Sequence, residues 1–215
     1  TAADMDLPDM EGAKYCCSPP PRDAQAQEAV WRGLANGTFQ VMSSDHAPYR
    51  FDESGKLANG PNASFKEIAM GVPGLELRLP LLYSEGVRTG RIDIHQFVAL
   101  TATNAAKIYG LHPRKGTIAI GADADIAIWD PEREITIKHD LLHDNAGYTP
   151  YEGRRITGWP VSVLSRGRVI VDDGALNAAR GSGVFLRCDS PASAQPAGKP
   201  VIELDPGQNF GAHLL

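Results

Sequence analysis

The residues best suited to chemistry stand where an apolar run, residues 39–43, gives way to a polar segment rich in Gly and Asn. Two serines at this junction precede Asp45, His46 and Pro48. Barrel enzymes keep active-site residues at the ends of such strands, and a carboxylate beside an imidazole suits a metal ligand that also carries a proton. The competing interpretation of Asp45 is an ordinary turn former or helix cap.

Two other groups of residues match metal sites less well. His139 and His143 stand four apart and on a helix could form two legs of a zinc site, but no third ligand or glutamate lies between them. The run Gly-Ala-Asp-Ala-Asp at residues 121–125 lacks the oxygen spacing and the closing Glu of a calcium loop. We therefore expect the two histidines at a surface or interface, and the run in a tight turn between strands.

Composition is typical of a globular protein and argues against some partners. The 215 residues are 42% hydrophobic and 22% charged, which is enough to bury a sizeable core. With 21 basic against 26 acidic residues, the net charge of -5 gives no footprint for nucleic acid or an anionic membrane. The absence of a signal peptide and of any run of about 18 apolar residues favours a cytoplasmic protein. Three cysteines in no metal-binding spacing indicate reduced, structural thiols: Cys16, Cys17 and Cys188.

The segments before Asp45 predict a βαβ unit. Residues 13–17 indicate a short strand stopped by three prolines, and residues 24–36 a helix with Asp23 as its N-cap. Residues 39–43 are then expected to form a buried parallel strand. A strand, a helix and a second strand are the repeating element of a barrel.

The segments that follow are a loop and then helices. Residues 47–65 predict an exposed loop over the barrel mouth. Apolar residues at helical spacing within residues 75–108 predict two or three helices that wrap the barrel, with Pro80 and Gly90 as interruptions.

After residue 113 the pattern changes to that of a small β-sheet domain. Alternating or apolar runs lie between Gly, Asp and Pro turns at residues 117–120, 125–129, 134–137, 161–164 and 168–171. Between these runs, residues 140–151 are expected to be irregular or briefly helical. Toward the end of the chain, residues 190–200 indicate a flexible linker, and residues 210–215 a short apolar end that could dock.

Five runs of the sequence, taken together and in order, resemble one family. They are Ser-Pro-Pro-x-Arg at residues 18–22, Ser-Asp-His-x-Pro at 44–48, Gly-Val-Pro-Gly-Leu-Glu-Leu-Arg at 71–78, Thr-Asn-Ala-Ala-Lys at 103–107 and Arg-Lys-Gly-Thr-Ile at 114–118. From about residue 9 to residue 187, the chain is similar to the C-terminal half of a hydantoinase or dihydropyrimidinase, which are cyclic amidases of the amidohydrolase superfamily.

The resemblance implies an α/β fold in three parts. Residues 1–112 would be the C-terminal portion of a (β/α)8 TIM-like barrel, residues 113–188 the C-terminal part of a small β-sandwich domain, and residues 189–215 a flexible C-terminal tail. Because the chain lacks an initiator Met and the family's earlier barrel strands, we expect a fragment that is inactive and prone to aggregate alone. The full-length protein is expected to be a homotetramer or homodimer, with no nucleic-acid or membrane partner.

The resemblance also implies the chemistry. Family members open hydantoins or dihydropyrimidines to N-carbamoyl amino acids at a binuclear Zn²⁺ site, whose other ligands, including a carboxylated Lys, would lie upstream of this chain. Asp45 matches the aspartate that binds the metal and transfers the proton, so it is the expected catalytic and metal-binding residue. Ser18 and Met70 match substrate-binding positions, although the family often has Asn where Met70 stands. His46 is expected to hydrogen-bond the surroundings of the site rather than to bind metal.

Other classes of protein stay open at this point. A non-catalytic, dihydropyrimidinase-like scaffold would keep the fold and lose the ligands, and the retention of Asp45 argues against it. Allantoinase or dihydroorotase relatives would carry other residues before the prolines at 19–21. The chain could also be a fragment whose only competence is binding or assembly.

Overall fold

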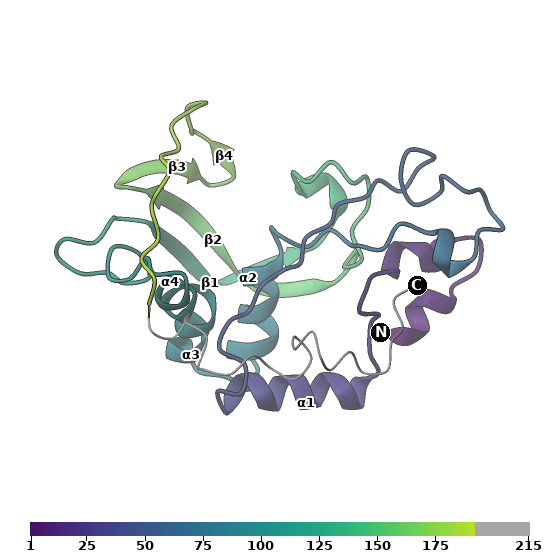
Figure 1. The fold of residues 1–215 in the computed structure, drawn as a ribbon, viewed down its shortest axis with the longest axis horizontal. Coiled ribbons are helices and arrows are strands. Elements are labelled where there is room, and N and C mark those ends of the chain that lie inside the picture. The colour runs from purple at the N-terminus through teal and green to yellow at the C-terminus, as the bar shows by residue number, and fades with distance from the viewer. Residues whose placement is uncertain (192–215) are drawn as a thin grey trace, which may run out of the picture.

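A computed structural model of the chain describes residues 1–191 and has an α/β architecture, with helices beside one small antiparallel sheet (Figure 1). Two 3-10 helices, Ala2–Asp6 and Glu11–Tyr15, lead through a proline-rich turn into α1, Ala24–Ala35, and two longer helical stretches lie between α1 and the sheet. A further short 3-10 helix, Phe65–Glu67, precedes these stretches. No helix within residues 1–191 is long and apolar enough to cross a membrane. The expected linker at residues 190–200 lies almost entirely outside the described residues, and the apolar end at 210–215 wholly so.

The helix predicted for residues 24–36 is confirmed as α1, Ala24–Ala35. Asp23 caps it as expected, because its side-chain oxygen accepts a hydrogen bond of 2.8 Å from the backbone N–H of Ala26. Near the other end, a Cβ built on Gly33 would lie 2.5 Å from the ring of Phe39. The absence of a side chain at Gly33 therefore lets the chain after α1 fold back against the helix.

Two longer helical stretches each combine α-helical and π-helical turns. The first is α2, Arg78–Leu82, which continues as a π-helix over Tyr83–Val87. The second starts as α3, Ile94–Val98, passes through a π-helix over Ala99–Thr103 and ends as α4, Asn104–Ile108. The prediction of two or three helices within residues 75–108 is therefore confirmed.

The expected interruptions of these helices differ in outcome. Gly90 lies in the turn between the two stretches with a φ of 75°, as expected of a residue that breaks a helix. The prediction that Pro80 also interrupts is wrong, because Pro80 lies in the first turn of α2. Backbone N–H groups in a first turn have no intrahelical partner, so a proline there removes no helical hydrogen bond.

The sheet consists of four antiparallel strands in the order β1-β2-β3-β4. Their bounds are β1 Ile126–Thr136, β2 Arg155–Ser165, β3 Arg168–Asp172 and β4 Ala175–Leu176. The runs predicted at 125–129 and 134–137 are one strand, because β1 pairs with β2 on both sides of an irregularity between Asp130 and Glu134. Pro131 lies in that irregularity, where a residue that cannot donate to the ladder is tolerated. The runs at 161–164 and 168–171 are confirmed within β2 and β3, whereas β4 was not predicted.

Three predicted strands are absent from the described residues. Residues 13–17 overlap the 3-10 helix Glu11–Tyr15, and residues 39–43 and 117–120 have no ladder partner. A strand draws its backbone hydrogen bonds from neighbouring strands, so an apolar run without a neighbour forms no ladder. Ile118 and Ile120 show the consequence, with exposed fractions of 82% and 109%. Residues 140–151 begin with a short 3-10 helix, His139–Leu141, and are otherwise irregular, as expected.

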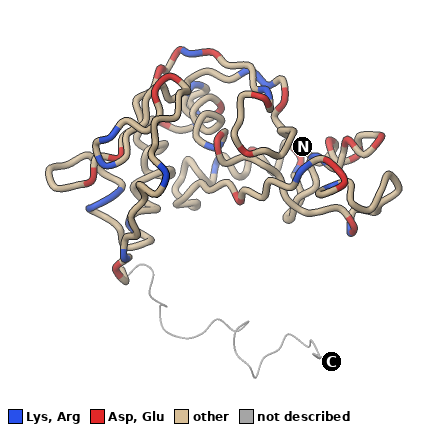
Figure 2. Tube along the Cα trace, turned by 90° about the horizontal axis from the view of Figure 1, so that it is seen from above, with Lys and Arg blue, Asp and Glu red and all other residues tan. Residues whose placement is uncertain are grey.

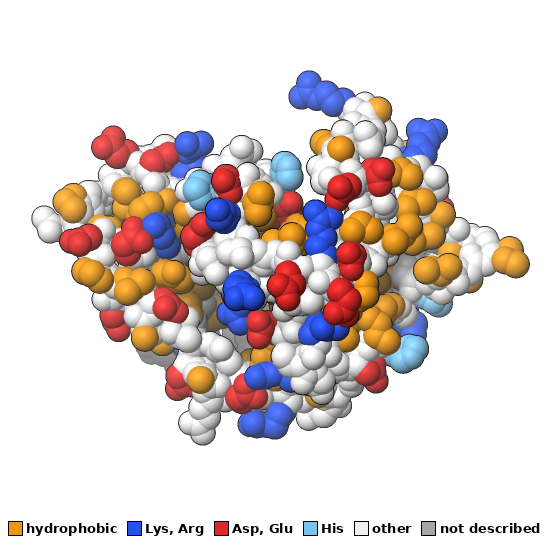
Figure 3. All heavy atoms as spheres, turned by 180° about the vertical axis from the view of Figure 1, so that it is seen from behind, with side chains coloured by type: hydrophobic (Ala, Val, Ile, Leu, Met, Phe, Trp, Pro, Cys, Tyr) orange, Lys and Arg blue, Asp and Glu red, His pale blue; other side chains and the backbone are white. Residues whose placement is uncertain are grey.

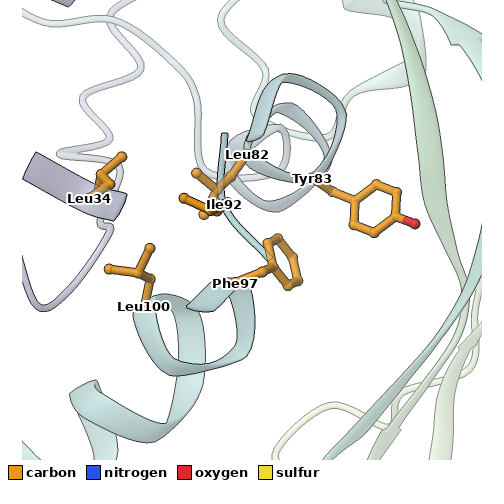
Figure 4. Close-up of a cluster of buried hydrophobic side chains, with 6 residues drawn as sticks. All are labelled: Leu34, Leu82, Tyr83, Ile92, Phe97 and Leu100. Carbon is orange, nitrogen blue, oxygen red and sulfur yellow. The ribbon is translucent and has the colours of Figure 1, made fainter. Parts of the chain in front are cut away.

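The largest buried cluster joins the helices to the sheet. Figure 4 shows its side chains, which come from α1, from both helical stretches and, for Ile92, from the turn between these stretches, with the ring of Tyr83 pointing toward the sheet: Leu34, Leu82, Tyr83, Ile92, Phe97 and Leu100. Trp129 of β1 packs against this cluster, with its ring centroid 5.3 Å from that of Tyr83 and 5.7 Å from that of Phe97. A second cluster of Leu77, Ile137 and Ile156, each at most 2% exposed, fixes the start of α2 against the sheet. The burial of Leu77 therefore fixes the C-terminal end of the segment 70–77, which precedes α2.

The surface mixes charge and apolar patches. Figure 2 shows basic and acidic residues interspersed along the described trace, without a long stripe of one sign. Figure 3 shows hydrophobic side chains gathered over the sheet and the loop before it. Exposed members there include Ile118, Ile120, Ile128 and Val169.

Candidate active site

Asp45 lies at a sharp turn of the backbone. Its φ of 45° is in the left-handed region, which non-glycine residues rarely adopt and which Asp and Asn tolerate best. The residue is exposed, and its carboxylate has no hydrogen bond or ion pair with any side chain or backbone group of residues 1–191. The carboxylate is thus presented to solvent by a conformation that other residue types would adopt at a cost.

His46 uses its ring to hold a neighbouring turn. Its Nδ1 accepts hydrogen bonds from the backbone N–H groups of Gly74, at 3.1 Å, and Leu75, at 3.2 Å. A nitrogen that accepts these bonds carries no proton, so the neutral ring has its proton on Nε2. The sequence predicted that His46 would hydrogen-bond around the site, and the side chain ties the turn at Gly74 to the residue after Asp45.

The backbone reinforces the link between these two segments. The N–H of Ala47 donates to the carbonyl of Val72 at 3.1 Å. A Cβ built on Gly71 would lie only 2.4 Å from the Cβ of Ala47. Since real side chains do not approach so closely, the contact requires glycine at residue 71.

Ser18 and Met70 lie on two segments that touch one another. The N–H of Gly71 donates to the carbonyl of Cys16 at 3.1 Å, which places the residue after Met70 beside the residues before Ser18. Ser18 is exposed and Met70 is 36% exposed. Burial raises the pKa of the Cys17 thiol, and the charge of Asp45 raises it further, so Cys17 lies within electrostatic range of Asp45.

The structure therefore brings three segments together. These are residues 16–18, 45–47 and 70–75, which carry the four residues singled out from the sequence. A groove of about 610 Å³ lies beside them: its lining includes Gly74 of the third segment, together with Pro20 and Ser44, which stand close in the chain to Ser18 and Asp45. Its volume is in the range of small-molecule sites. A larger groove of about 910 Å³ is lined by residues of the helices and of β1, including Phe97 and Trp129, and by neither Asp45 nor Ser18.

Lys56 is a buried residue of this region that sequence reasoning missed. It is 1% exposed, and its Nζ donates to the carbonyls of Cys16 and Ala69, both at 2.9 Å. Burial lowers the pKa of the Lys56 ammonium. No pattern in the sequence marks it, because lysine is one of the residue types least often buried.

The loop at residues 47–65 is exposed over much of its length, as predicted, but its turn is well ordered. Asp52 Oδ1 accepts hydrogen bonds from the hydroxyl and the backbone N–H of Ser54, and Arg50 Nε donates to Oδ2 at 2.6 Å. The bonds from Ser54 and Arg50 lower the pKa of the Asp52 carboxyl to about 2. The compact turn places Lys56 toward the interior rather than toward solvent.

The other residues considered as metal ligands are engaged elsewhere. His143 Nδ1 lies 3.1 Å from Glu76, and His139 Nδ1 lies 3.7 Å from Glu152, so the two histidines do not share a helix face. Among residues 1–191, no cluster of three or more His, Cys, Asp or Glu could hold a metal ion. Structural and catalytic zinc sites use at least three protein ligands. Asp45 therefore fits the role of one ligand and not that of a whole site.

Comparisons with known proteins show which family this chain belongs to. The model of the amidohydrolase family matches residues 9–170. The D-hydantoinase of Rhizobium radiobacter is 46% identical over 187 residues, which are 87% of this chain and 40% of that protein, and the D-hydantoinase of Ralstonia pickettii is 45% identical over the same shares. The solved dihydropyrimidinase from Brevibacillus agri is 41% identical with a TM-score of 0.84, covering 90% of this chain and 41% of that one. The solved L-hydantoinase from Arthrobacter aurescens is 28% identical with a TM-score of 0.66, and the match covers 81% of this chain and 39% of that one. The chain thus spans about 40% of the length of the relatives it matches.

Proposed function

Since this chain belongs to the amidohydrolase family, we propose that it is part of an enzyme that hydrolyses cyclic amides, opening hydantoin or dihydropyrimidine rings to N-carbamoyl amino acids. One observation supports the proposal most strongly. Asp45 presents an exposed carboxylate, without a partner among residues 1–191, where three tied segments meet beside a groove. All three segments lie within residues 9–170, which match the model of the amidohydrolase family.

Hydrolysis of a cyclic amide gives a carboxylate such as Asp45 a definite task. Water adds to the carbonyl carbon, the bond from that carbon to the ring nitrogen breaks, and the nitrogen is a poor leaving group until it is protonated. We assign both proton transfers to Asp45: one oxygen accepts the proton of the attacking water and then delivers it to the departing nitrogen. General acid–base catalysis of this kind contributes roughly 10²–10⁴-fold.

The proposed metal is Zn²⁺, with one oxygen of Asp45 as a ligand. A bound zinc ion would polarise the amide carbonyl and lower the pKa of water. The chemistry of the donor fits this role, because Asp45 offers a hard oxygen that residues 1–191 do not engage. His46 would not be a ligand through Nδ1, which the backbone of Gly74 and Leu75 occupies. The remaining ligands would lie outside these 215 residues.

Ser18 and Met70 are the proposed substrate contacts. Ser18 is exposed, and the prolines after it restrict its backbone. Met70 would act through its main chain, because hydrogen bonds hold the residues on both sides of it. The Ala69 carbonyl accepts from Lys56, and the Gly71 N–H donates to the Cys16 carbonyl. A contact made by the backbone depends on the position of the residue rather than on its side chain.

The finer description of the fold is also a proposal. We infer that residues 1–112 form the late part of a (β/α)8 barrel, where residues 39–43 would pair with a strand supplied outside residues 1–191. Residues 113–188 would belong to a small β-sandwich domain, and the assembled enzyme would be a homotetramer or homodimer. The apolar and unpaired state of residues 117–120 supports such completion, because exposed apolar edges are otherwise rare.

The decisive test replaces Asp45 in the full-length gene product. Asp45→Ala should abolish ring opening of dihydrouracil and hydantoin, and Asp45→Asn should also fail while retaining part of the zinc, since an amide oxygen can still bind. Turnover and zinc content by atomic absorption are measured together. Glu53→Gln, which changes an exposed acid in the neighbouring loop, is the matched control. Near-normal turnover by Asp45→Ala would refute the assignment.

A further inference from the structure

Lys56 is the charged side chain most completely buried among residues 1–191, and its contacts are unusual. Its ammonium donates hydrogen bonds to two carbonyl oxygens, those of Cys16 and Ala69, both 2.9 Å away. No carboxylate of the described residues lies within ion-pair distance of Nζ. A buried charge without a counter-ion is costly, and an apolar side chain of similar length would avoid that cost. Stability alone therefore gives a weak reason for lysine at this position.

The two carbonyls that Lys56 binds flank the proposed substrate contacts. The Cys16 carbonyl lies two residues before Ser18 and also accepts the N–H of Gly71 at 3.1 Å. The Ala69 carbonyl immediately precedes Met70. Met70 is thus fixed on one side by the Lys56 ammonium and on the other by the bond from Gly71.

The local fold directs Lys56 to this position. The N–H of Lys56 donates to the carbonyl of Arg50 at 2.8 Å, closing a turn in which Gly55 lies against the Arg50 backbone. A Cβ built on Gly55 would be 2.1 Å from the Arg50 carbonyl oxygen, so this turn requires glycine directly before the lysine. The ordered turn fixes the base of the lysine stem, and the stem extends into the space between the two substrate segments.

We propose that Lys56 is a positioning residue for ring opening, whose ammonium holds the segments of Ser18 and Met70 at the separation that binds the cyclic amide. This role rests on the proposed function. Lys56 does not touch the reacting atoms. It acts through the two carbonyls, and its effect falls on substrate binding.

The test uses Lys56→Met in the full-length gene product, with Lys66→Met as the matched control, because Lys66 is exposed in the short 3-10 helix, Phe65–Glu67, that follows the loop. Methionine keeps the length and volume of the side chain and removes the donors. Two hydrogen bonds from a charged donor predict a rise in KM for dihydrouracil of about 10-fold or more, with kcat changed less than KM and zinc content unchanged. Lys66→Met should leave KM unchanged.

Hydrogen exchange of the Gly71 amide gives a readout that does not depend on activity. In Lys56→Met the Gly71 amide should exchange at least about 10-fold faster, because its acceptor segment is no longer held. The Met42 amide, which donates to the Leu100 carbonyl at 3.0 Å, should keep its rate and serves as the reference for global unfolding. Equal acceleration of both amides with an unchanged KM would mean that Lys56 is merely structural and would overturn the proposal.

The unmodified protein provides a further test if Lys56→Met does not fold. Burial lowers the pKa of the Lys56 ammonium, so the amine loses its proton at a lower pH than an exposed lysine, and KM for dihydrouracil should rise as the pH is increased. A constant KM would contradict the positioning role. If the unmodified protein hydrolyses neither dihydrouracil nor hydantoin, the proposed function fails, and the exchange of Gly71 still decides whether Lys56 joins the two segments.

Discussion

Replacing Gly71 with alanine should separate the segment of Asp45 from the segment of Met70. The added Cβ would lie 2.4 Å from the Cβ of Ala47, about 1 Å closer than the shortest ordinary carbon contact of about 3.5 Å. It would also lie 3.1 Å from the Ala47 carbonyl oxygen and 3.1 Å from the ring of Tyr49. The Cβ of alanine cannot rotate away, so the backbone must move.

The size of the effect follows from this clash. Overpacking of this kind costs about 1–3 kcal/mol, and for a domain of this size each kcal/mol lowers Tm by about 2–4 °C. Gly71→Ala should therefore lower Tm by about 2–12 °C. Because Ala47 lies two residues after Asp45, a shift approaching 1 Å could also lower kcat/KM for dihydrouracil by up to about 10²-fold.

Gly74→Ala provides a matched control in the same segment. A Cβ at residue 74 would meet nothing within 4 Å, and its backbone N–H would still donate to His46. Alanine there should be neutral or stabilising by about 0.4–1 kcal/mol, since it reduces the freedom of the unfolded chain. Thermal melts and turnover of the two variants are compared in the full-length gene product. Equal Tm and equal turnover would refute the argument that the Gly71 contact holds the site together.

Two further predictions concern the core and the loop. Trp129→Ala should destabilise the protein by about 3 kcal/mol, the lower end for this substitution because the residue is only partly buried. Glu134→Ala, at an exposed position of the same strand, should change Tm by less than about 2 °C, and equal melts of the two variants would contradict the assignment of Trp129 to the core. Asp52 has a folded-state pKa of about 2, below its ordinary value, so the ordering that it gives the loop should be complete above about pH 4 and lost only as the pH falls through about 2. NMR titration of the Asp52 carboxyl checks this, and a midpoint near pH 4 would show that the bonds from Ser54 and Arg50 do not form in solution.

The elements that the sequence predicted well carry their determinants locally. The helix α1 has a capping aspartate before it and an Asn-Gly pair after it, and both signals act within a few residues. The strands β2 and β3 were predicted from alternation, and each finds its ladder partner close by in the chain. Where the partner is absent from the described residues, as for 39–43 and 117–120, the same apolar pattern misled the prediction because pattern alone does not reveal the neighbour.

In the candidate site too, the sequence identified residues marked by local motifs and missed a residue whose role depends on distant contacts. Asp45 and Ser18 were identified from motifs, which are properties of short runs of sequence. Lys56 was not, because its importance comes from carbonyls 40 and 13 residues away, at Cys16 and Ala69. A lysine in a polar loop has the composition of a solvated residue, and only the fold gives it a buried position.

Because contacts between distant segments shape the site, we expect substrate binding to depend on residues that do not touch the substrate. None of its three segments belongs to a helix or strand, so no ladder fixes their spacing. Their separation depends instead on single contacts: the ring of His46 on one turn, the ammonium of Lys56 between two carbonyls, and the close approach at Gly71. The contacts of His46 and Gly71 join residues 45–47 to residues 70–75, and the ammonium of Lys56 joins Cys16 to Ala69, so only a few bonds hold each pair of segments. Lys56→Met should therefore alter substrate binding more than it alters global stability, whereas Trp129→Ala should do the reverse.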